Sequence, residues 1–526
     1  MKKLSFIILA VFLAISCQKK REEKKTFKIG LIMFPRTVDS RKNGDIPSST
    51  VINMLYQGLT TICEDNTPAL ALAERYELSK DQKTYTFYLR DAKWTDGKPV
   101  TAYDFEKSWK KVIDPDFPSL TPQLFYSIVN AEKAHKREVP LDEVGVKAIN
   151  DKTLVVKLKH PTPYFLTLIS FNAFFAVPTH IADKLDEIVN HNPQDLICNG
   201  PFKLKRWDYN DKIIVEKNES YWNAKNVFLN SVHISIVKDE NTILQMYENN
   251  ELDYIGAYVA PIPIDSIPYV LKDPNHRLSE IGATTFCAFN LEKFPFNNKN
   301  MRKAFGYAIN RAKIVKNIIQ ANDRIATRCI PPILMNDKDF KLYEDNDIEG
   351  AKKHFEKGLK ELNITRKDLK ITFTHSTELL TKKQAEVLQE TWEKTFNIKV
   401  KLEPLERKVL YDRLHKKQFQ STLAMWLTFY PDPTDILYRF KHKIHSKNYP
   451  CWENKKFIEL LDYAETLTDL QKREKTLEEA ERIFIEDMPI SPIYHHNLIT
   501  LTKPDVKGIF ITQIGEVHYD KIYFKK

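Results

Sequence analysis

One short stretch has the residue types of a nucleophilic site. Ser108-Trp-Lys-Lys111 places a serine three positions before a lysine, a spacing in which the lysine can activate the serine for acyl transfer. The Ser-Asp-Asn and Lys-Thr-Gly motifs that accompany it in such enzymes are missing, as are GxSxG, P-loop and HExxH motifs. The four residues also follow an amphipathic helical pattern, so we interpret the match as a chance occurrence.

Two histidine pairs have spacings that metal sites use, namely His442 with His445 and His495 with His496. Zinc needs three or four protein ligands, and neither pair has a carboxylate–histidine constellation nearby in the sequence. We expect surface or structural roles for them, and we expect no metal and no cofactor. The lack of a recognisable reactive centre favours binding over catalysis, so the chain is not expected to be an enzyme.

Large aromatic side chains mark the best candidate for a binding wall. In AMWLTFYPDPTD, residues 424–435, an apolar run ends in Trp426, Phe429 and Tyr430 and then meets two prolines and two aspartates. The segments before it alternate strand and helix patterns, as β-α-β-α-β, which predicts a parallel, doubly wound α/β sheet. Ligands of such sheets lie beyond the carboxyl ends of the strands. The rings therefore either face a ligand or fill the protein's own core.

Local signals predict further elements. TYTFYLR at 84–90 alternates apolar and polar residues and predicts a strand. The capping box Thr101–Asp104 predicts a helix that ends before Asp114-Pro115. A second capping box at Thr468–Gln471 predicts a helix that ends at Asp487-Met488-Pro489.

Length and charge limit the class of protein. A chain of 526 residues is too long for one ordinary core, so two or three domains are expected. The formal net charge is +10, and about half of this excess lies in the first 25 residues. The rest is diffuse, and no basic stripe interleaved with aromatic residues is evident. We therefore expect no nucleic-acid partner.

The N-terminus predicts export and lipid attachment. Two lysines precede an apolar run from Leu4 to Ile15 that is too short to span a bilayer comfortably. Residues 1–16 are expected to be a signal peptide whose Leu-Ala-Ile-Ser end resembles a bacterial lipobox, with Cys17 as the lipidated residue. An ordinary signal peptide with an incidental cysteine is the alternative. Residues 17–26 are predicted to form a polar tether.

Five more cysteines are widely spaced and include no CxxC pair. An exported protein can form disulfides, but an odd number leaves at least one cysteine unpaired. Most are expected to be small buried hydrophobic residues. They are Cys63, Cys198, Cys287, Cys329 and Cys451.

Four blocks carry a resemblance to a known family. They are VINMLYQGLT (51–60), PALALAERYELSKDQKTYTFYLRDAKWTDGKPVTAYDF (68–105), NGPFKLKRWDYNDKIIVEKNESYWN (199–223) and FNLEKFPFNNKNMRKAFGYAINRAKIV (289–315). From about Phe27 to the C-terminus, the chain resembles the family 5 extracellular solute-binding proteins of ABC importers, and within it the oligopeptide-binding lipoproteins.

The resemblance implies a two-lobed periplasmic-binding-protein-like fold of type II with three structural domains. Domain I combines 27–65, 200–280 and 495–526; domain II is 66–199 and domain III is 281–494. Crossings near 281 and 494 form a hinge, and the lobes close on a ligand between them. A peptide then lies extended in the cleft and bonds through its backbone to strand edges.

The resemblance also implies site residues, with departures. Trp426, Phe429 and Tyr430 line the cleft, but Phe429 stands where peptide receptors of this family carry the aspartate that neutralises the peptide's ammonium group. Asp432 is a possible substitute. Expected ligand-binding residues elsewhere are Asn43, Asp45 and Ile46 at the cleft rim, Phe286 and Cys287 on a strand, and Arg407 and Arg413 on a helix. The changed anchors favour a particular ligand, such as a cell-wall peptide or a blocked peptide.

The leading hypothesis is a monomeric, membrane-anchored receptor that faces the periplasm or the cell exterior and delivers a peptide to an ABC permease. Three alternatives stay open: a nickel- or haem-carrying relative, a secreted hydrolase with an unrecognised site, and an adhesive surface lipoprotein with a vestigial cleft.

Overall fold

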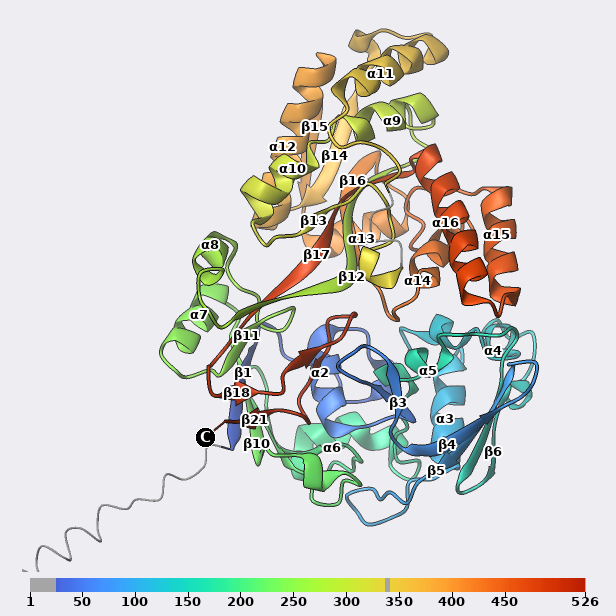
Figure 1. The fold of residues 1–526 in the computed structure, drawn as a ribbon, viewed down its shortest axis with the longest axis vertical. Coiled ribbons are helices and arrows are strands. Elements are labelled where there is room, and N and C mark those ends of the chain that lie inside the picture. Colours follow the sequence, from blue (N-terminus) through green and yellow to red (C-terminus); the bar gives the residue numbers. More distant parts are fainter. Residues whose placement is uncertain (1–24, 336–340, 526) are drawn as a thin grey trace, which may run out of the picture.

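The protein has two lobes, as the predicted fold class requires. The computed structural model describes residues 25–335 and 341–525, so the expected signal peptide and Cys17 lie outside the described residues. In Figure 1 most blue and green elements form the lower lobe, and most yellow and orange elements form the upper lobe. Within the described ranges, no helix has the length and apolar content needed to cross a membrane.

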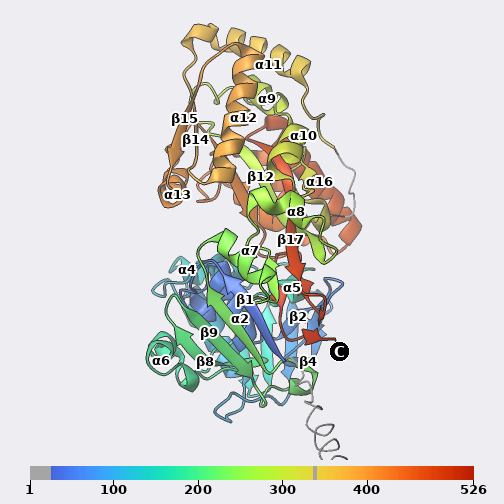
Figure 2. The same ribbon diagram turned by 90° about the vertical axis from the view of Figure 1, so that its left-hand side faces the viewer.

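One 11-stranded sheet runs through both lobes. Two long antiparallel strands at its centre, β12 (His276–Phe289) and β17 (Ile490–Thr502), pass from one lobe to the other (Figures 1 and 2). Their register shifts between Glu280 and Thr284, beside the crossing predicted at residue 281. A register shift of this kind bends a strand pair locally, so the sheet changes direction where the lobes meet.

The upper end of this sheet confirms the predicted β-α-β-α-β unit. Its members are β14 (Ile371–Ser376), α12 (Leu379–Phe396), β15 (Val400–Leu405), α13 (Arg407–His415) and β16 (Ser421–Leu427). Strand β14 is parallel to both β15 and β16, and β16 is antiparallel to β12. The carboxyl end of β16, which carries the aromatic residues, therefore points toward the lower lobe.

The lower lobe holds the other end of the large sheet and a separate four-stranded sheet of order β4-β5-β7-β6. In β5 (Thr84–Leu89) Tyr85, Phe87 and Leu89 are buried, which confirms the predicted alternation. Helix α3 (Ala102–Ile113) begins at the capping box of Thr101 and Asp104, as predicted.

Helix α16 (Leu470–Asp487) differs from its prediction by one residue. Its N-cap is Asp469, whose carboxylate accepts hydrogen bonds from the amides of Gln471 and Lys472. Thr468 was expected in that role. An aspartate is as good an N-cap as a threonine, so a local pattern with both residues does not decide between them.

The remaining elements complete the two lobes. The strands are β1 (Thr26–Leu31), β2 (Thr60–Ile62), β3 (Pro68–Leu70), β4 (Ala73–Leu78), β6 (Val146–Asn150), β7 (Thr153–Lys157), β8 (Phe202–Asp208), β9 (Lys212–Lys217), β10 (Ser231–Ile236), β11 (Tyr254–Gly256), β13 (Arg324–Ile325), β18 (Val506–Lys507), β19 (Phe510–Ile511), β20 (Val517–His518) and β21 (Tyr523–Phe524). The helices are α2 (Ile46–Leu55), α4 (Ala131–His135), α5 (Phe165–Leu168), α6 (Leu185–His191), α7 (Glu240–Glu248), α8 (Ile267–Val270), α9 (Lys299–Tyr307), α10 (Arg311–Ile314), α11 (Ile348–Leu362), α14 (Thr434–Leu437) and α15 (Lys455–Thr466).

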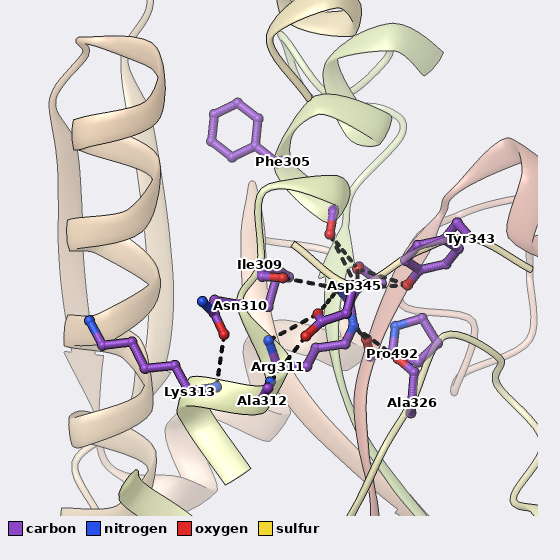
Figure 3. A network of polar contacts seen from close by, with 12 residues as sticks. Phe305, Ile309, Asn310, Arg311, Ala312, Lys313, Ala326, Tyr343, Asp345 and Pro492 are labelled. Atoms are coloured by element: carbon purple, nitrogen blue, oxygen red, sulfur yellow. Dashed lines mark hydrogen bonds and ion pairs between the residues drawn. The ribbon is translucent and has the colours of Figure 1, made fainter. Parts of the chain in front are cut away.

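A buried arginine ties the upper lobe to β17. The guanidinium of Arg311, at the start of α10, donates to the carbonyl oxygens of Ala326 and Pro492 at 2.9 and 2.7 Å (Figure 3). It also donates to the hydroxyl of Tyr343 at 2.7 Å and pairs with Asp345 at 3.1 Å. The network therefore joins three separate segments, at Arg311, Ala326 and Tyr343–Asp345, to β17, one of the two strands that connect the lobes.

The five cysteines in the described ranges form no disulfide. Cys198, Cys287 and Cys329 are buried, and Cys63 is exposed. The three buried thiols agree with the expected role as small apolar residues.

Candidate functional site

A cavity of about 310 Å³ lies between the lobes, a size at the lower end of small-ligand sites. Its lower wall comes from the start of α2, from Phe171 and from the C-terminal segment 514–517. Its upper wall comes from β16, the short helical turn at Arg439 and the loop at 447–449. Six of the eleven predicted binding residues line it: Asn43, Asp45, Ile46, Phe286, Trp426 and Phe429.

The rim loop before α2 is held by hydrogen bonds of its own. The Asn43 side-chain amide donates to Ser49 Oγ at 2.7 Å and to Asn172 Oδ1 at 2.8 Å. Asp45 is the N-cap of α2 and accepts from the Ser48 amide at 2.8 Å, while its other oxygen pairs with Arg36 at 2.9 Å. These contacts fix the loop and leave Asp45 partly neutralised.

The upper wall contains polar atoms that lack partners. Trp426 is buried, with its ring centroid 4.1 Å from that of Phe286, so it belongs to the core and to the cavity wall together. Its Nε1–H and the Thr428 hydroxyl have no hydrogen-bond partner among the described residues, and the Tyr258 hydroxyl across the cavity has none either. A buried donor without an acceptor costs about 1–3 kcal/mol, and a ligand in the cavity can remove that cost.

Two cations lie close to the Phe429 ring. Lys447 Nζ is 4.4 Å from the Phe429 ring centroid and the Arg439 guanidinium is 5.9 Å from it. Arg439 also pairs with Asp435 at 2.5 Å, and Asp435 accepts from the Phe429 amide at 3.2 Å. From the lower lobe, the Phe171 ring approaches Phe429 edge-on at 6.0 Å.

Tyr430 lines a second cavity, of about 650 Å³, which shares Phe429, Arg439 and Lys447 with the first. Its ring stacks on Tyr164 of the lower lobe, with centroids 4.9 Å apart and planes 6° apart. The aromatic exit of β16 thus contacts the opposite lobe at two points.

Two charged groups in the first cavity are poorly solvated. Burial raises the pKa of Glu516 to about 7. Its neighbours are the side-chain amides of Asn172, 3.3 Å from Oε1, and of Asn53. Burial, and then the nearby Arg439 charge, lower the pKa of Lys447 to about 8. Both charges would be stabilised by an opposite charge in the cavity.

Four predicted residues lie outside the lining of both cavities. Cys287 is buried on β12, Arg407 is exposed and pairs with Glu378 at 3.3 Å, and Arg413 pairs with Glu403 at 3.0 Å. Asp432 makes a two-point ion pair with Arg473 at 2.8 and 2.9 Å. Because both Asp432 oxygens are already paired, its charge is committed within the upper lobe.

The residues first considered for catalysis and metal binding have other partners. Ser108 is buried, and its hydroxyl accepts from the Val177 amide at 3.0 Å. His495 and His496 contact the hydroxyls of Thr284 and Thr285. His442 and His445 line the second cavity, and no group of three or more metal-binding side chains exists in the described part of the chain.

Several lining residues had no signal in the sequence, chiefly Asn53, Phe171, Tyr258, Lys447 and Glu516. They come from segments that are far apart in the chain. A charged residue in a C-terminal loop looks like any surface residue until the fold places it in a cavity.

Two lobes that are joined by two strands and that meet around a polar-lined cavity define a bilobal solute receptor. A family model described as bacterial extracellular solute-binding proteins, family 5 middle, matches residues 67–448. The chain belongs to this family, as the sequence blocks indicated.

Individual relatives match this chain over nearly its whole length. The oligopeptide-binding protein OppA of Bacillus subtilis is 36% identical over 513 residues, covering 97% of this chain and 94% of that protein. A periplasmic oligopeptide-binding protein of Borrelia burgdorferi superposes with a TM-score of 0.82 at 28% identity, covering 95% of this chain and all of that one. Listeria monocytogenes OppA bound to peptide gives a TM-score of 0.79 at 26% identity, covering 95% and 99%.

Proposed function

We propose that this protein is a membrane-anchored receptor that captures a peptide between its lobes and delivers it to an ABC permease. The observation that carries the proposal is the set of buried polar groups without partners in the interlobe cavity: Trp426 Nε1, Thr428 Oγ1 and the Tyr258 hydroxyl. Peptide backbone offers a donor and an acceptor at every residue, so it can satisfy donors and acceptors on both walls.

The family supports this choice of ligand. The relatives named above are oligopeptide-binding proteins, and one is a complex with peptide. A murein peptide-binding protein, MppA of Escherichia coli, is also a relative, at 28% identity over 506 residues. Asn43, Asp45, Ile46, Phe286, Trp426 and Phe429 form the cavity part of the proposed site, and Tyr430 forms part of its extension.

The location and domain division belong to the same proposal. Cleavage before Cys17 and lipid attachment there would leave a short polar tether before β1, which starts at Thr26 in the lower lobe. The protein would face the periplasm or cell exterior as a monomer and would carry no catalytic activity. Domain II (66–199) and domain III (281–494) would close about the β12–β17 crossing.

Native mass spectrometry of protein purified without refolding tests this function. We expect a bound peptide of unchanged mass, because a receptor releases what it captured. Adding that peptide at 100 times its Kd should stabilise the fold by about 2.7 kcal/mol. Recovery of cleaved peptide would indicate a hydrolase, and binding of a metal chelate in place of any peptide would indicate a different kind of cargo.

A further inference from the structure

We propose that the interlobe cavity selects a zwitterionic ligand, with the ligand's cationic group at Glu516 and its anionic group at Lys447. The inference rests on the proposed function and deepens it, because it assigns the charges of the ligand and the orientation in which the ligand lies.

Glu516 forms the acidic end of the cavity. It belongs to the lower lobe, in the turn between β19 and β20, and no cationic side chain in the described ranges pairs with it. Its neighbour Asn172 is buried, and the Asn172 amide donates both to Glu516 Oε1 at 3.3 Å and to Asn53 Oδ1 at 3.1 Å. Amide groups hold the carboxyl group in place but supply no positive charge, so a ligand ammonium beside it would stabilise its ionised form.

Lys447 forms the basic end. It belongs to the upper lobe and lines both cavities, and its ammonium lies 4.4 Å from the Phe429 ring centroid. Within the described residues no carboxylate is at ion-pair distance from it, and Asp435, an acid that acts on its charge, pairs with Arg439 at 2.5 Å. An aromatic face is a weak substitute for an anion, so a ligand carboxylate would be a stronger partner.

The two charges line one cavity but form no ion pair with each other. They also sit on opposite lobes. A ligand with both charges can contact Glu516 and Lys447 together, and each contact then stabilises the arrangement in which the lobes meet. A ligand with only one charge leaves the other group desolvated and unpaired, which is costly.

Short random peptides in three forms provide the test: free, N-acetylated and C-amidated. Each library is mixed with the full-length protein and the retained peptides are quantified by native mass spectrometry. We expect the wild type to retain the free library at least about 10-fold better than either blocked library, since a charge-assisted contact contributes about 1.5–3 kcal/mol. Glu516→Gln should lose the discrimination against acetylated peptides only, and Lys447→Met the discrimination against amidated peptides only.

Controls separate charge from structure. Glu516→Asp and Lys447→Arg keep the charge and should keep the corresponding preference. Lys443→Met and Glu251→Gln, at exposed residues, should leave both preferences as in the wild type. Equal retention of the three libraries by the wild type, or loss of both preferences in either variant, would overturn the inference while leaving peptide capture intact. Failure to retain any library would instead contradict the proposed function itself.

Discussion

At the residue scale, Trp426 shows how a side chain can serve two purposes. Its ring packs against Phe286 and Phe440, with centroids 4.1 and 5.8 Å apart, while its Nε1–H lies in the cavity wall without a partner in the described residues. The sequence left a choice between core and ligand contact. The structure combines the two roles, so removing the whole ring would confuse folding with binding.

The substitution Trp426→Phe separates the packing role of the ring from the hydrogen-bonding role of Nε1–H. The variant keeps an aromatic ring but lacks the donor, so we expect affinity for the captured peptide to fall about 2- to 10-fold, the effect of one hydrogen bond of about 0.5–1.5 kcal/mol. Isothermal titration measures this loss. Trp109→Phe is the control, because Trp109 Nε1 donates to the Phe174 carbonyl at 2.8 Å inside the lower lobe; it should reduce stability and leave affinity unchanged. Unchanged affinity in Trp426→Phe would argue against the proposed contact.

Glu516 predicts a pH dependence of stability. Its pKa is about 7 in the folded protein and about 4.3 in an unfolded chain. Between these values the unfolded chain releases the proton and the folded protein keeps it, so the free energy of unfolding falls as the pH rises from about 4.5 to 7. Because the side chain is only partly buried, we expect less than about 3 kcal/mol in total.

Urea denaturation at pH 5 and pH 8 measures this slope in the wild type and in Glu516→Gln. The glutamine variant should gain stability relative to the wild type at pH 8 and show little difference at pH 5. Glu251→Gln, at an exposed carboxylate, should show the same small effect at both values. An equal difference at both pH values for Glu516→Gln would exclude the ionisation as its cause.

At the scale of elements, the upper lobe depends on a few buried polar networks. Arg311 joins α10 to the segment near Ala326, to Tyr343 and Asp345, and to β17 through Pro492 (Figure 3). None of these segments is adjacent in sequence. The network fixes β17 just before it enters the other lobe, and so it positions the strand that connects the two halves of the molecule.

Arg311→Met should therefore destabilise the protein by about 3–5 kcal/mol, because it leaves several buried carbonyl groups without this donor and the Asp345 carboxylate without its cationic partner. Denaturant unfolding measures the loss. Arg407→Met is the matched control, since Arg407 is exposed and makes one exposed ion pair; such pairs contribute about 0–1 kcal/mol. It should also leave ligand affinity unchanged, because Arg407 lies outside both cavities. A comparable loss in the two variants would contradict this account.

At the scale of the whole molecule, binding depends on how the lobes meet. Two aromatic contacts join the lobes, because Tyr164 stacks on Tyr430 and Phe171 meets Phe429. The exposed pair Lys383–Asp265 also joins them, at 3.2 Å. The long strands β12 and β17 also connect the lobes, and their pairing is irregular near residues 280–284. A ligand that contacts both walls stabilises the same arrangement of the lobes as these contacts do. Its affinity therefore depends partly on the free energy that the interlobe contacts contribute.

Tyr164→Ala should weaken the arrangement in which the lobes meet. The lost aromatic pair is worth about 0.5–1.5 kcal/mol, so we expect affinity to fall about 2- to 10-fold and the ligand-free protein to have a larger radius of gyration. Small-angle scattering with and without ligand measures the second effect. Tyr269→Ala, at a residue that is 65% exposed on α8, should change neither quantity. No change in size or affinity for Tyr164→Ala would show that the stack does not hold the lobes.

Local periodicity in the sequence determined the β-α-β-α-β unit, strand β5, the start of α3 and the place where aromatic residues leave β16, because each depends on residues within one element. Only the tertiary structure brought Lys447 to Phe429 and Glu516 to Asn172, paired Asp432 with Arg473, and placed Arg407 at the surface. These contacts join residues that are 18 to 344 positions apart. Local patterns in the sequence do not encode these contacts, because the fold decides which distant segments meet and therefore which charged side chains line the cavity.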